Sequence, residues 1–252
     1  MRVDIDAVLA AFDDQIRRHP SGPVERDAHI VRTVSPGGGW NGVTWSDLRS
    51  ADVDAVVAAQ VARYAEAGCA FEWKLYSYDQ PPDLPQRLAA AGLVAEPQES
   101  LMFAEVDDLA PGAALPDGVM LVPVTDVQGV DRLVRLHDEV FGGDHTALGR
   151  EVFAGLGGRV EAVLAVADDR VIAGGRVELN PGSDFAGLWG GGTVPDWRGR
   201  GVFRALVAHR AAIARERGYR WLQVDALPTS RPILERLGFV QLATTTPYVS
   251  AS

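Results

Sequence analysis

The chain has 252 residues, 47% of them hydrophobic, which suffices to bury the core of one large domain or two small ones. Its formal net charge of −10 argues against a nucleic-acid or anionic-membrane partner, because phosphate surfaces select for basic proteins. The single cysteine excludes an internal disulfide. Acidic residues stand where a signal peptide would be apolar, and no apolar run reaches the ~20 residues of a membrane span. We therefore expect a cytoplasmic protein.

Hydrophobic periodicity and turn residues predict alternating helices and strands in the first half of the chain. Glycine marks the expected end of the longest of these helices, because it adopts the left-handed conformation that closes a helix. The predicted elements are a helix over Asp4–Arg18, strands over His29–Val34 and Val43–Trp45, a helix over Asp52–Ala67, a strand over Phe71–Tyr78, a helix over Leu84–Ala91 and a strand over Ser100–Val106.

The stretch Asp107–Gly118 carries two prolines, two glycines and three acidic residues. Such a composition is typical of a linker. The sequence therefore predicts a first domain over residues 1–108, a linker over 109–118 and a second domain over 119–252.

The second half continues the alternation of helices and strands, and two of its strands form a predicted hairpin across Asp168-Asp169. Asp126 or Thr125 is expected near the cap of its first helix. The predicted elements are a strand over Val119–Val124, helices over Asp131–Val140 and Ala147–Leu156, strands over Val160–Ala167, Val171–Leu179 and Phe185–Val194, a helix over Val202–Arg217, a strand over Tyr219–Ala226, a helix over Arg231–Leu237 and a strand that ends at Val249.

The two halves of the chain contain similar sequence segments, a similarity that we call the internal echo. Phe71–Tyr76 is similar to Tyr219–Val224, and Arg87–Val94 is similar to Leu234–Val240 in the position of its glycine and apolar pair. In each half a long helix that ends at a glycine precedes the first of these segments. The echo predicts two copies of one helix-strand-helix-strand unit.

The most informative segment is the basic glycine loop Arg198–Gly201, which lies between a predicted strand and a predicted helix. The free N–H groups and the dipole of a helix N-terminus attract anions, glycine lets the backbone approach a ligand, and arginine supplies charge. The segment lacks the Gly-Lys-Ser/Thr end of a Walker A loop and the third glycine of a dinucleotide fingerprint. It predicts a phosphate-bearing cofactor other than a nucleoside triphosphate or NAD.

The order of strand, basic glycine loop, long helix, strand and short helix resembles the GNAT superfamily of acyl-CoA-dependent N-acetyltransferases. The motifs Arg198–Val202 and Ile233–Phe239 carry the resemblance, which extends approximately over residues 119–249. It implies an α/β (α+β) GNAT fold with a central mixed sheet flanked by helices. With the internal echo, it implies two tandem GNAT-like units, of which the first is degenerate because it lacks the basic glycine loop.

The same resemblance implies acetyl-CoA as the cofactor. Backbone groups of Thr193 and Val194 would pair with its pantetheine arm, the amides from Gly199 to Phe203 would hold its pyrophosphate, and Ser230 would face the arm. The glycines of 190–192 suit a strand that bulges. The implied cofactor-binding residues are Thr193, Val194, Arg198, Gly199, Arg200, Gly201, Val202, Phe203 and Ser230.

Direct transfer to an amine needs a proton acceptor and a group that stabilises the oxyanion. The expected oxyanion donor is the Val194 amide, and the candidate bases are Glu178 first and Asp225 second. The helical residues His137–Glu139 either bind a cationic amine or form a solvated helix face.

The sequence therefore predicts an acetyl-CoA-dependent N-acetyltransferase that acts on a primary amine of a small molecule, as a monomer or a homodimer. The alternative is a catalytically silent CoA-binding or regulatory module. Phe203 favours that alternative because the family usually has Gly or Ala there, and so does Leu234, where many members have a Tyr that protonates the leaving thiolate. His145 and His209 have no partners at ligand spacing, so no metal site is expected.

Overall fold

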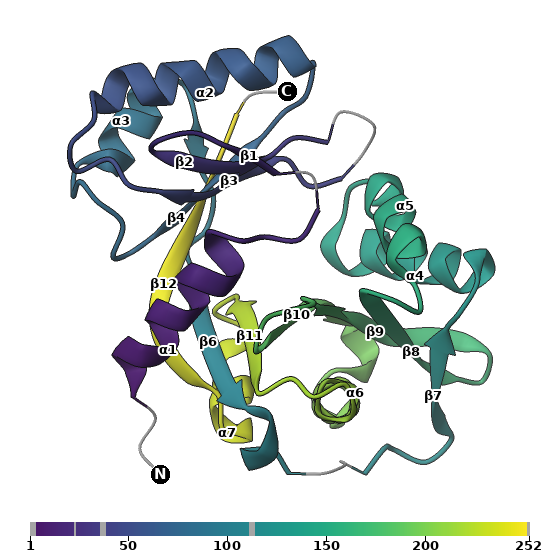
Figure 1. The fold of residues 1–252 in the computed structure, drawn as a ribbon. Helices are drawn as coiled ribbons and strands as arrows, with labels where there is room; N and C mark the ends of the chain where they lie inside the picture. The colour runs from purple at the N-terminus through teal and green to yellow at the C-terminus, as the bar shows by residue number, and fades with distance from the viewer. Residues whose placement is uncertain (1–3, 23, 36–38, 111–113, 251–252) are drawn as a thin grey trace. The chain divides into compact units, whose positions relative to one another are not determined.

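The computed structural model describes residues 4–22, 24–35, 39–110 and 114–250. Its strands form a mixed sheet flanked by helices, so the predicted fold class is confirmed (Figure 1). Packing divides the chain into two compact units, and each is described by itself. Unit 1 comprises Met1–Met102, Asp225–Arg231 and Gln241–Ser252, and unit 2 comprises Phe103–Val224 and Pro232–Val240.

Unit 1 is built around a parallel strand-helix-strand crossover. Its elements are α1 (Ile5–Phe12), a π-helical turn (Asp13–Arg17), β1 (Val24–Arg26), β2 (Ile30–Thr33), β3 (Gly42–Ser46), α2 (Val53–Ala67), β4 (Glu72–Tyr76), α3 (Leu84–Ala90), β5 (Val94–Ala95), the start of β6 (Glu99–Glu105) and β12 (Val240–Val249). Strands β1, β2 and β3 are antiparallel, β3 and β4 are parallel, and β12 is antiparallel to β4. Helix α2 connects the two parallel strands and ends at Gly68, which has a left-handed φ of 66°.

Unit 2 contains a second crossover of the same kind. After a 3₁₀ turn (Val106–Asp108), its elements are β7 (Val119–Val124), α4 (Val127–Phe141), α5 (Thr146–Gly155), β8 (Val160–Ala167), β9 (Arg170–Leu179), β10 (Phe185–Thr193), a 3₁₀ turn (Pro195–Trp197), α6 (Val202–Glu216), β11 (Trp221–Ala226) and α7 (Arg231–Leu237). Strands β7 to β10 form an antiparallel meander, and α6 connects β10 to β11, which runs parallel to it. The Asp126 carboxylate accepts a 2.8 Å hydrogen bond from Gly129 N at the start of α4, so its predicted capping role is confirmed.

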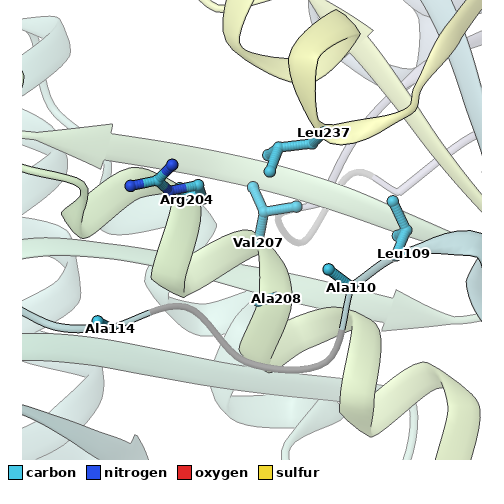
Figure 2. A pocket seen from close by; sticks show the side chains of 7 residues that line it. All are labelled: Leu109, Ala110, Ala114, Arg204, Val207, Ala208 and Leu237. Atoms are coloured by element: carbon cyan, nitrogen blue, oxygen red, sulfur yellow. The ribbon is translucent and has the colours of Figure 1, made fainter.

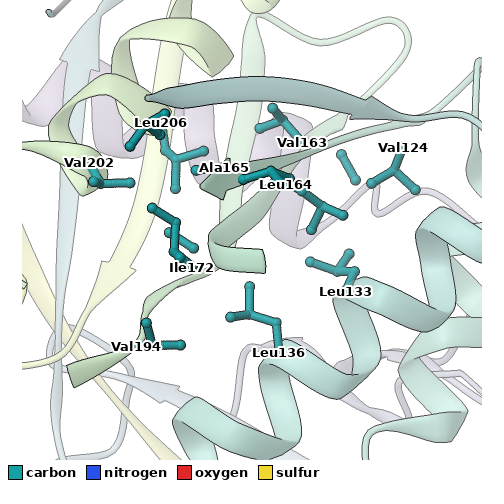
Figure 3. Packing of buried hydrophobic residues seen from close by; sticks show 14 of the residues in the cluster. Val124, Leu133, Leu136, Val163, Leu164, Ala165, Ile172, Val194, Val202 and Leu206 are labelled. Carbon is teal, nitrogen blue, oxygen red and sulfur yellow. The ribbon is translucent and has the colours of Figure 1, made fainter. Parts of the chain in front are cut away.

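The core of unit 2 is an apolar cluster between its sheet and its helices (Figure 3). Helix α4 contributes Leu133 and Leu136, and α6 contributes Val202 and Leu206. Val194, directly after β10, has no exposed surface and is part of the same cluster. The cluster therefore anchors both the strand end and the helix start that flank the basic glycine loop.

The predicted elements are confirmed, with ends displaced by a few residues, and the short strands β1 and β5 were not predicted. The predicted domain boundaries remain a prediction, because packing places β12 in unit 1 while the boundary assigns it to the second domain. Of the predicted linker, residues 111–113 lie outside the described residues.

The internal echo has a counterpart in topology. In both units an antiparallel pair leads into a parallel crossover, β3-α2-β4 in one and β10-α6-β11 in the other. The echoed tryptophans occupy matching places, since Trp73 pairs with Val43 and Trp221 pairs with Phe185 in the parallel ladders. This repeat of connection and register agrees with the predicted two-copy organisation.

Candidate active site

The predicted loop connects β10 to α6 in unit 2. Gly199 and Gly201 have φ values of 74° and 87°, a conformation that glycine adopts without steric cost. Gly201 is the N-cap of α6 and provides no side-chain cap, so no capping side chain covers the first-turn amides of the helix. Bare amides and the positive end of the helix dipole together form an anion-binding geometry.

The two arginines of the loop have different roles. The Arg198 guanidinium donates through Nε to Thr193 O at 3.0 Å and so holds the loop against the end of β10. The Arg200 guanidinium lies 4.7 Å from the centre of the Trp197 ring and is exposed. Arg198 therefore shapes the loop, whereas Arg200 is a surface charge beside it.

Strand β10 loses its partner on one side before it ends. The parallel ladder with β11 pairs Phe185 to Gly187 with Trp221 to Gln223, and among the described residues no pair follows, although β10 continues to Thr193. On its other side, β10 shifts register against β9 between Trp189 and Gly192. The bulge predicted from the three glycines is therefore confirmed, and the backbone of β10 beyond Gly187 has an edge without a strand in the described part of unit 2.

At the end of this edge the backbone and side chain differ in their hydrogen bonding. The Val194 N–H, the predicted oxyanion donor, donates to Ile172 O at 2.9 Å, so the sheet already uses it. The buried Thr193 hydroxyl, in contrast, has no hydrogen-bond partner among the described residues. A buried hydroxyl without a hydrogen-bond partner destabilises the folded state unless a ligand or a water molecule forms that hydrogen bond.

Phe203, the predicted obstacle in the loop, packs on the bulge. A Cβ added to Gly191 would meet Phe203 Cε2 at 3.0 Å, so the ring lies directly over this glycine. The missing side chain at Gly191 makes room for the large one at Phe203. The aromatic ring is thus accommodated on the α6 face of the sheet.

A buried arginine supports the bulge from the same face. Arg210 on α6 has an exposed fraction of 1%, and its Nη1 donates to Arg176 O at 3.1 Å and to Trp189 O at 3.4 Å. Burial, with a smaller effect of the Arg176 charge, lowers the pKa of Arg210 to about 10. The guanidinium thereby satisfies strand carbonyls where the register shift interrupts the ladder.

The opposite face of the bulge meets α4. His137 on α4 is buried, and its Nε2–H donates to Gly190 O at 3.0 Å. Phe141, one turn further along α4, lies against Gly192, where an added Cβ would meet its Cζ at 3.0 Å. Two aromatic side chains of α4 therefore contact the first and last glycine of the bulge.

His137 is expected to make the protein less stable in acid. Burial first and the Arg176 charge second lower the pKa of His137 to about 4, whereas an unfolded histidine titrates near ~6.5. Between these values the unfolded state binds more protons, so the free energy of unfolding falls by about 2 kcal/mol from pH 7 to pH 5. Urea denaturation of the wild type and of His137→Gln at both pH values measures this loss.

Comparing the wild type with His137→Gln isolates the effect of the histidine on the pH dependence of the unfolding free energy. The comparison is needed because Glu99 changes this free energy with pH in the opposite direction. Burial raises the pKa of Glu99 to about 7, so its native state gains protons, and stability, as the pH falls through the same window. His137→Gln keeps the contribution of Glu99 and loses that of the imidazole. An equal pH dependence in both proteins would contradict the assignment.

The two predicted bases are both ion-paired. Glu178 on β9 accepts from Arg176 Nε at 2.7 Å, and its side chain is partly exposed. Asp225 belongs to unit 1, where its buried carboxylate pairs with Lys74 Nζ. Ser230, also in unit 1, donates its hydroxyl to Leu227 O at 3.1 Å. Glu178 and Asp225 therefore each have a cationic partner in the structure.

Sequence reasoning missed a histidine-carboxylate pair between α4 and α5. Asp138 Oδ1 lies 2.9 Å from His145 Nδ1 and accepts a second bond from His145 N at 3.0 Å. The sequence predicts for Asp138 either contact with a cationic amine or a place on a solvated helix face, and for His145 no metal-binding partner. Their separation of seven residues crosses the loop between the end of α4 and the start of α5, so the period of neither helix could pair them.

In the described part of unit 1, a buried arginine contacts both strands of the crossover. The parallel ladder between β3 and β4 is also short, with Gly42 and Val43 opposite Glu72 and Trp73. Beyond it, Arg17 Nε donates to Thr44 O on β3 at 3.0 Å, and its guanidinium lies 3.9 Å from the centre of the Tyr76 ring on β4.

The guanidinium of Arg17 is fixed there by carboxylates. It donates twice to Asp79 at 2.8 Å and once to Asp13 at 2.8 Å. With an exposed fraction of 2%, the Arg17 side chain contacts both strands of this crossover beyond their paired residues. We interpret Arg17 as a plug that closes the first copy.

A pocket of about 400 Å³ in unit 2 is lined by none of the bulge glycines (Figure 2). It lies against α6 and α7, and its lining is apolar except for one arginine. The described residues that line it are Leu109, Ala110, Ala114, Arg204, Val207, Ala208 and Leu237. Because none of these side chains is an acid, a base or a nucleophile at neutral pH, we place no chemistry there.

The described residues also bear on membrane spans and metal sites. Within the described ranges, no helix has the length and apolar character needed to cross a membrane. The same residues contain no group of three or more histidine, cysteine or acidic side chains that could hold a metal ion.

Comparison with known proteins gives a match to one family model within the second half of the chain. Residues 130–239 match the sequence model described as the Acetyltransferase (GNAT) family. No curated protein sequence matches the chain.

Solved structures resemble the whole chain in fold. A GCN5-related N-acetyltransferase from Kribbella flavida has a TM-score of 0.72 at 16% identity, over 100% of this chain and 97% of that one. A functionally unknown conserved protein from Staphylococcus epidermidis has a TM-score of 0.69 at 12% identity, over 95% and 96%. A tandem GNAT protein from the clavulanic acid biosynthesis pathway has a TM-score of 0.61 at 16% identity, over 88% and 78%. At these identities, the likeness shows the fold.

Proposed function

We propose, from the match of residues 130–239 to the Acetyltransferase (GNAT) family model, that this chain transfers an acetyl group from acetyl-CoA to a primary amine of a small molecule. The observation that carries the proposal is the unpaired edge of β10, followed directly by the glycine loop and the bare N-terminus of α6. This arrangement offers a strand edge for an extended amide-bearing arm and an anion site for a pyrophosphate.

The residues present fit such a cofactor on two observations. The buried Thr193 hydroxyl lacks a partner among the described residues and can be completed by a polar group of the arm. Gly199 and Gly201 keep the backbone bare beside the α6 amides. We assign the pantetheine arm to the β10 edge near Thr193 and Val194, and the pyrophosphate to the amides from Gly199 to Phe203, with Arg200 as a nearby charge.

Acetyl-CoA would supply an activated thioester carbonyl, whose thiol leaving group has a pKa of about 8.5 and needs little acid assistance. The chain would supply orientation through the β10 edge and a proton acceptor for the amine. Because the Val194 amide donates to Ile172 O, we assign it to holding the strand end. Amides of the bulge glycines Gly190 and Gly191, which the β9 ladder leaves out, are our candidates for stabilising the oxyanion.

Isothermal titration with acetyl-CoA tests the cofactor, and thiol release with a panel of amines tests the transfer. Spermidine, kanamycin, lysine and a peptide with a free N-terminus cover the acceptor classes that remain open. We expect one acetyl-CoA bound per chain, because Arg17 closes the equivalent place in unit 1. Absence of binding at high micromolar ligand would refute the proposal, and two sites per chain would refute the plug.

The alternative is a CoA-binding module without transfer. Leu234, which replaces the tyrosine of many family members, has an exposed fraction of 1% and offers no proton to a thiolate. Tight binding of acetyl-CoA with no thiol release for any amine of the panel would favour this alternative. Release above the uncatalysed rate would exclude it.

A further inference from the structure

We propose that His145, held by Asp138, is the catalytic proton acceptor for the amine, an inference that rests on the proposed N-acetyltransferase function. The imidazole Nδ1 lies 2.9 Å from Asp138 Oδ1. Because a carboxylate accepts and does not donate, Nδ1 carries the proton and Nε2 presents its lone pair. Nε2 has no hydrogen-bond partner among the described residues, and the side chain is partly exposed, so a substrate can reach it.

The imidazole is held by Asp138 and lies on an ordered turn. Asp138 accepts a bond from the backbone N–H of His145 as well as from the ring. Asp144, the preceding residue, accepts from Thr146 N at 2.8 Å and orders the turn into α5. Such support from neighbouring groups holds a catalytic ring in one orientation before substrate arrives.

The pair adjoins the bulge of β10 through an aromatic cluster of three rings. The rings of His137 and His145 are 5.5 Å apart, and that of Phe141 lies 6.3 Å from His145. His137 bonds Gly190 O, and Phe141 packs on Gly192. His145 is therefore the outermost ring of a cluster whose other two rings contact the bulge.

The other titratable groups of this region are poor proton acceptors. Glu178 already accepts from Arg176 Nε at 2.7 Å through its Oε1. His137 is buried, and its Nε2–H is already donated to Gly190 O. Asp138 on α4 accepts from the His145 ring, and Asp144 lies next to His145 in the loop before α5.

The proposed step balances as follows. The amine nitrogen forms a bond to the thioester carbonyl carbon, the carbon–sulfur bond breaks, and the sulfur leaves with its electron pair as a thiolate. One proton of the attacking nitrogen passes to Nε2 of His145, and the imidazolium is stabilised by Asp138. The proton then passes to the thiolate or to solvent, which restores the neutral ring.

Two measurements test the role. The first uses the free protein, where nitrogen-15 spectra report which ring nitrogen of His145 carries the proton. We expect the Nδ1–H tautomer in the wild type and a shift toward Nε2–H in Asp138→Ala, because the acceptor that selects the tautomer is lost. A wild-type ring in the Nε2–H form would overturn the proposal without any reference to acetyl-CoA.

The second measurement compares kcat/KM with acetyl-CoA and the best amine of the panel. We expect the His145→Ala substitution to lower kcat/KM at least about 100-fold, since general bases contribute roughly 10²–10⁴-fold. Added imidazole should then raise the kcat/KM of this variant about tenfold. His209→Ala on α6 is the matched control and should leave the rate unchanged. Glu178→Gln should retain most of the wild-type rate.

The outcomes separate this inference from the proposed function. A wild type that releases no thiol with any amine overturns both. An active wild type with an undiminished His145→Ala variant, or with a loss that imidazole does not rescue, overturns only the role of His145. A loss in Glu178→Gln equal to that expected for His145→Ala would assign the proton to Glu178 instead.

Discussion

Replacing Arg17 with alanine is expected to remove about 3–5 kcal/mol from the free energy of unfolding. Nη2 of Arg17 donates to both carboxylate oxygens of Asp79 at 2.8 Å, and the two side chains have exposed fractions of 2% and 4%. Without the guanidinium, the Asp79 carboxylate would remain buried without its counter-charge, and desolvation of a lone charge costs far more than loss of a solvated pair. Thr44 O on β3 would lose its donor in the same variant.

Chemical denaturation measures this loss, and Arg49→Ala is the matched control in the same unit. Arg49 forms an equivalent pair with Asp47 at 2.8 Å, but the arginine side chain has an exposed fraction of 71%. Solvent screens such a pair, so we expect no measurable change in the unfolding free energy. Equal effects of the two substitutions would contradict the assignment of Arg17 as a buried plug.

A double variant tests the reason for the loss. If the cost arises from the stranded carboxylate, then Asp79→Leu combined with Arg17→Met should recover much of the stability, because apolar pairs of similar volume often replace buried ion pairs without loss. A double variant as unstable as Arg17→Ala would show instead that the hydrogen bond to Thr44 O dominates.

The regular elements of both units could be predicted because their signals are local. Gly68 and Gly218 end α2 and α6 with φ values of 66° and 81°, and each stands directly after or near the last periodic residue of its helix. The glycine loop and the bulge were predicted for the same reason, since a run of glycines in a strand has few structural explanations.

The chemistry of the site depends on contacts that no local pattern contains. Arg17 and Asp79 are 62 residues apart, and the Asp225 carboxylate is buried by a lysine from β4, because β12 and the end of β11 pack in unit 1. Sequence alone therefore selected Asp225 as a base without showing the cation that holds it. His145 was missed because its partner lies across a loop, where spacing carries no geometric information.

Substituting Gly201 with valine is expected to weaken acetyl-CoA binding at least 100-fold, which corresponds to about 2.7 kcal/mol. Gly201 has a φ of 87° at the N-cap of α6, a conformation that a β-branched residue avoids. The loop would have to move to relieve the strain, and the α6 amides would no longer converge on the pyrophosphate. Isothermal titration of the variant with acetyl-CoA measures the change.

A matched glycine separates lost binding from lost folding. Gly182 has a φ of 83° in the exposed turn between β9 and β10, and an added Cβ there would meet no atom within 4 Å. Gly182→Val carries the same backbone strain of about 1–2 kcal/mol, so both variants should lose similar stability in denaturation. Only Gly201→Val should lose affinity, since only its backbone borders the proposed phosphate site. If Gly182→Val bound acetyl-CoA as weakly as Gly201→Val, the loss would follow from general destabilisation, and the anion site at the start of α6 would have to be abandoned.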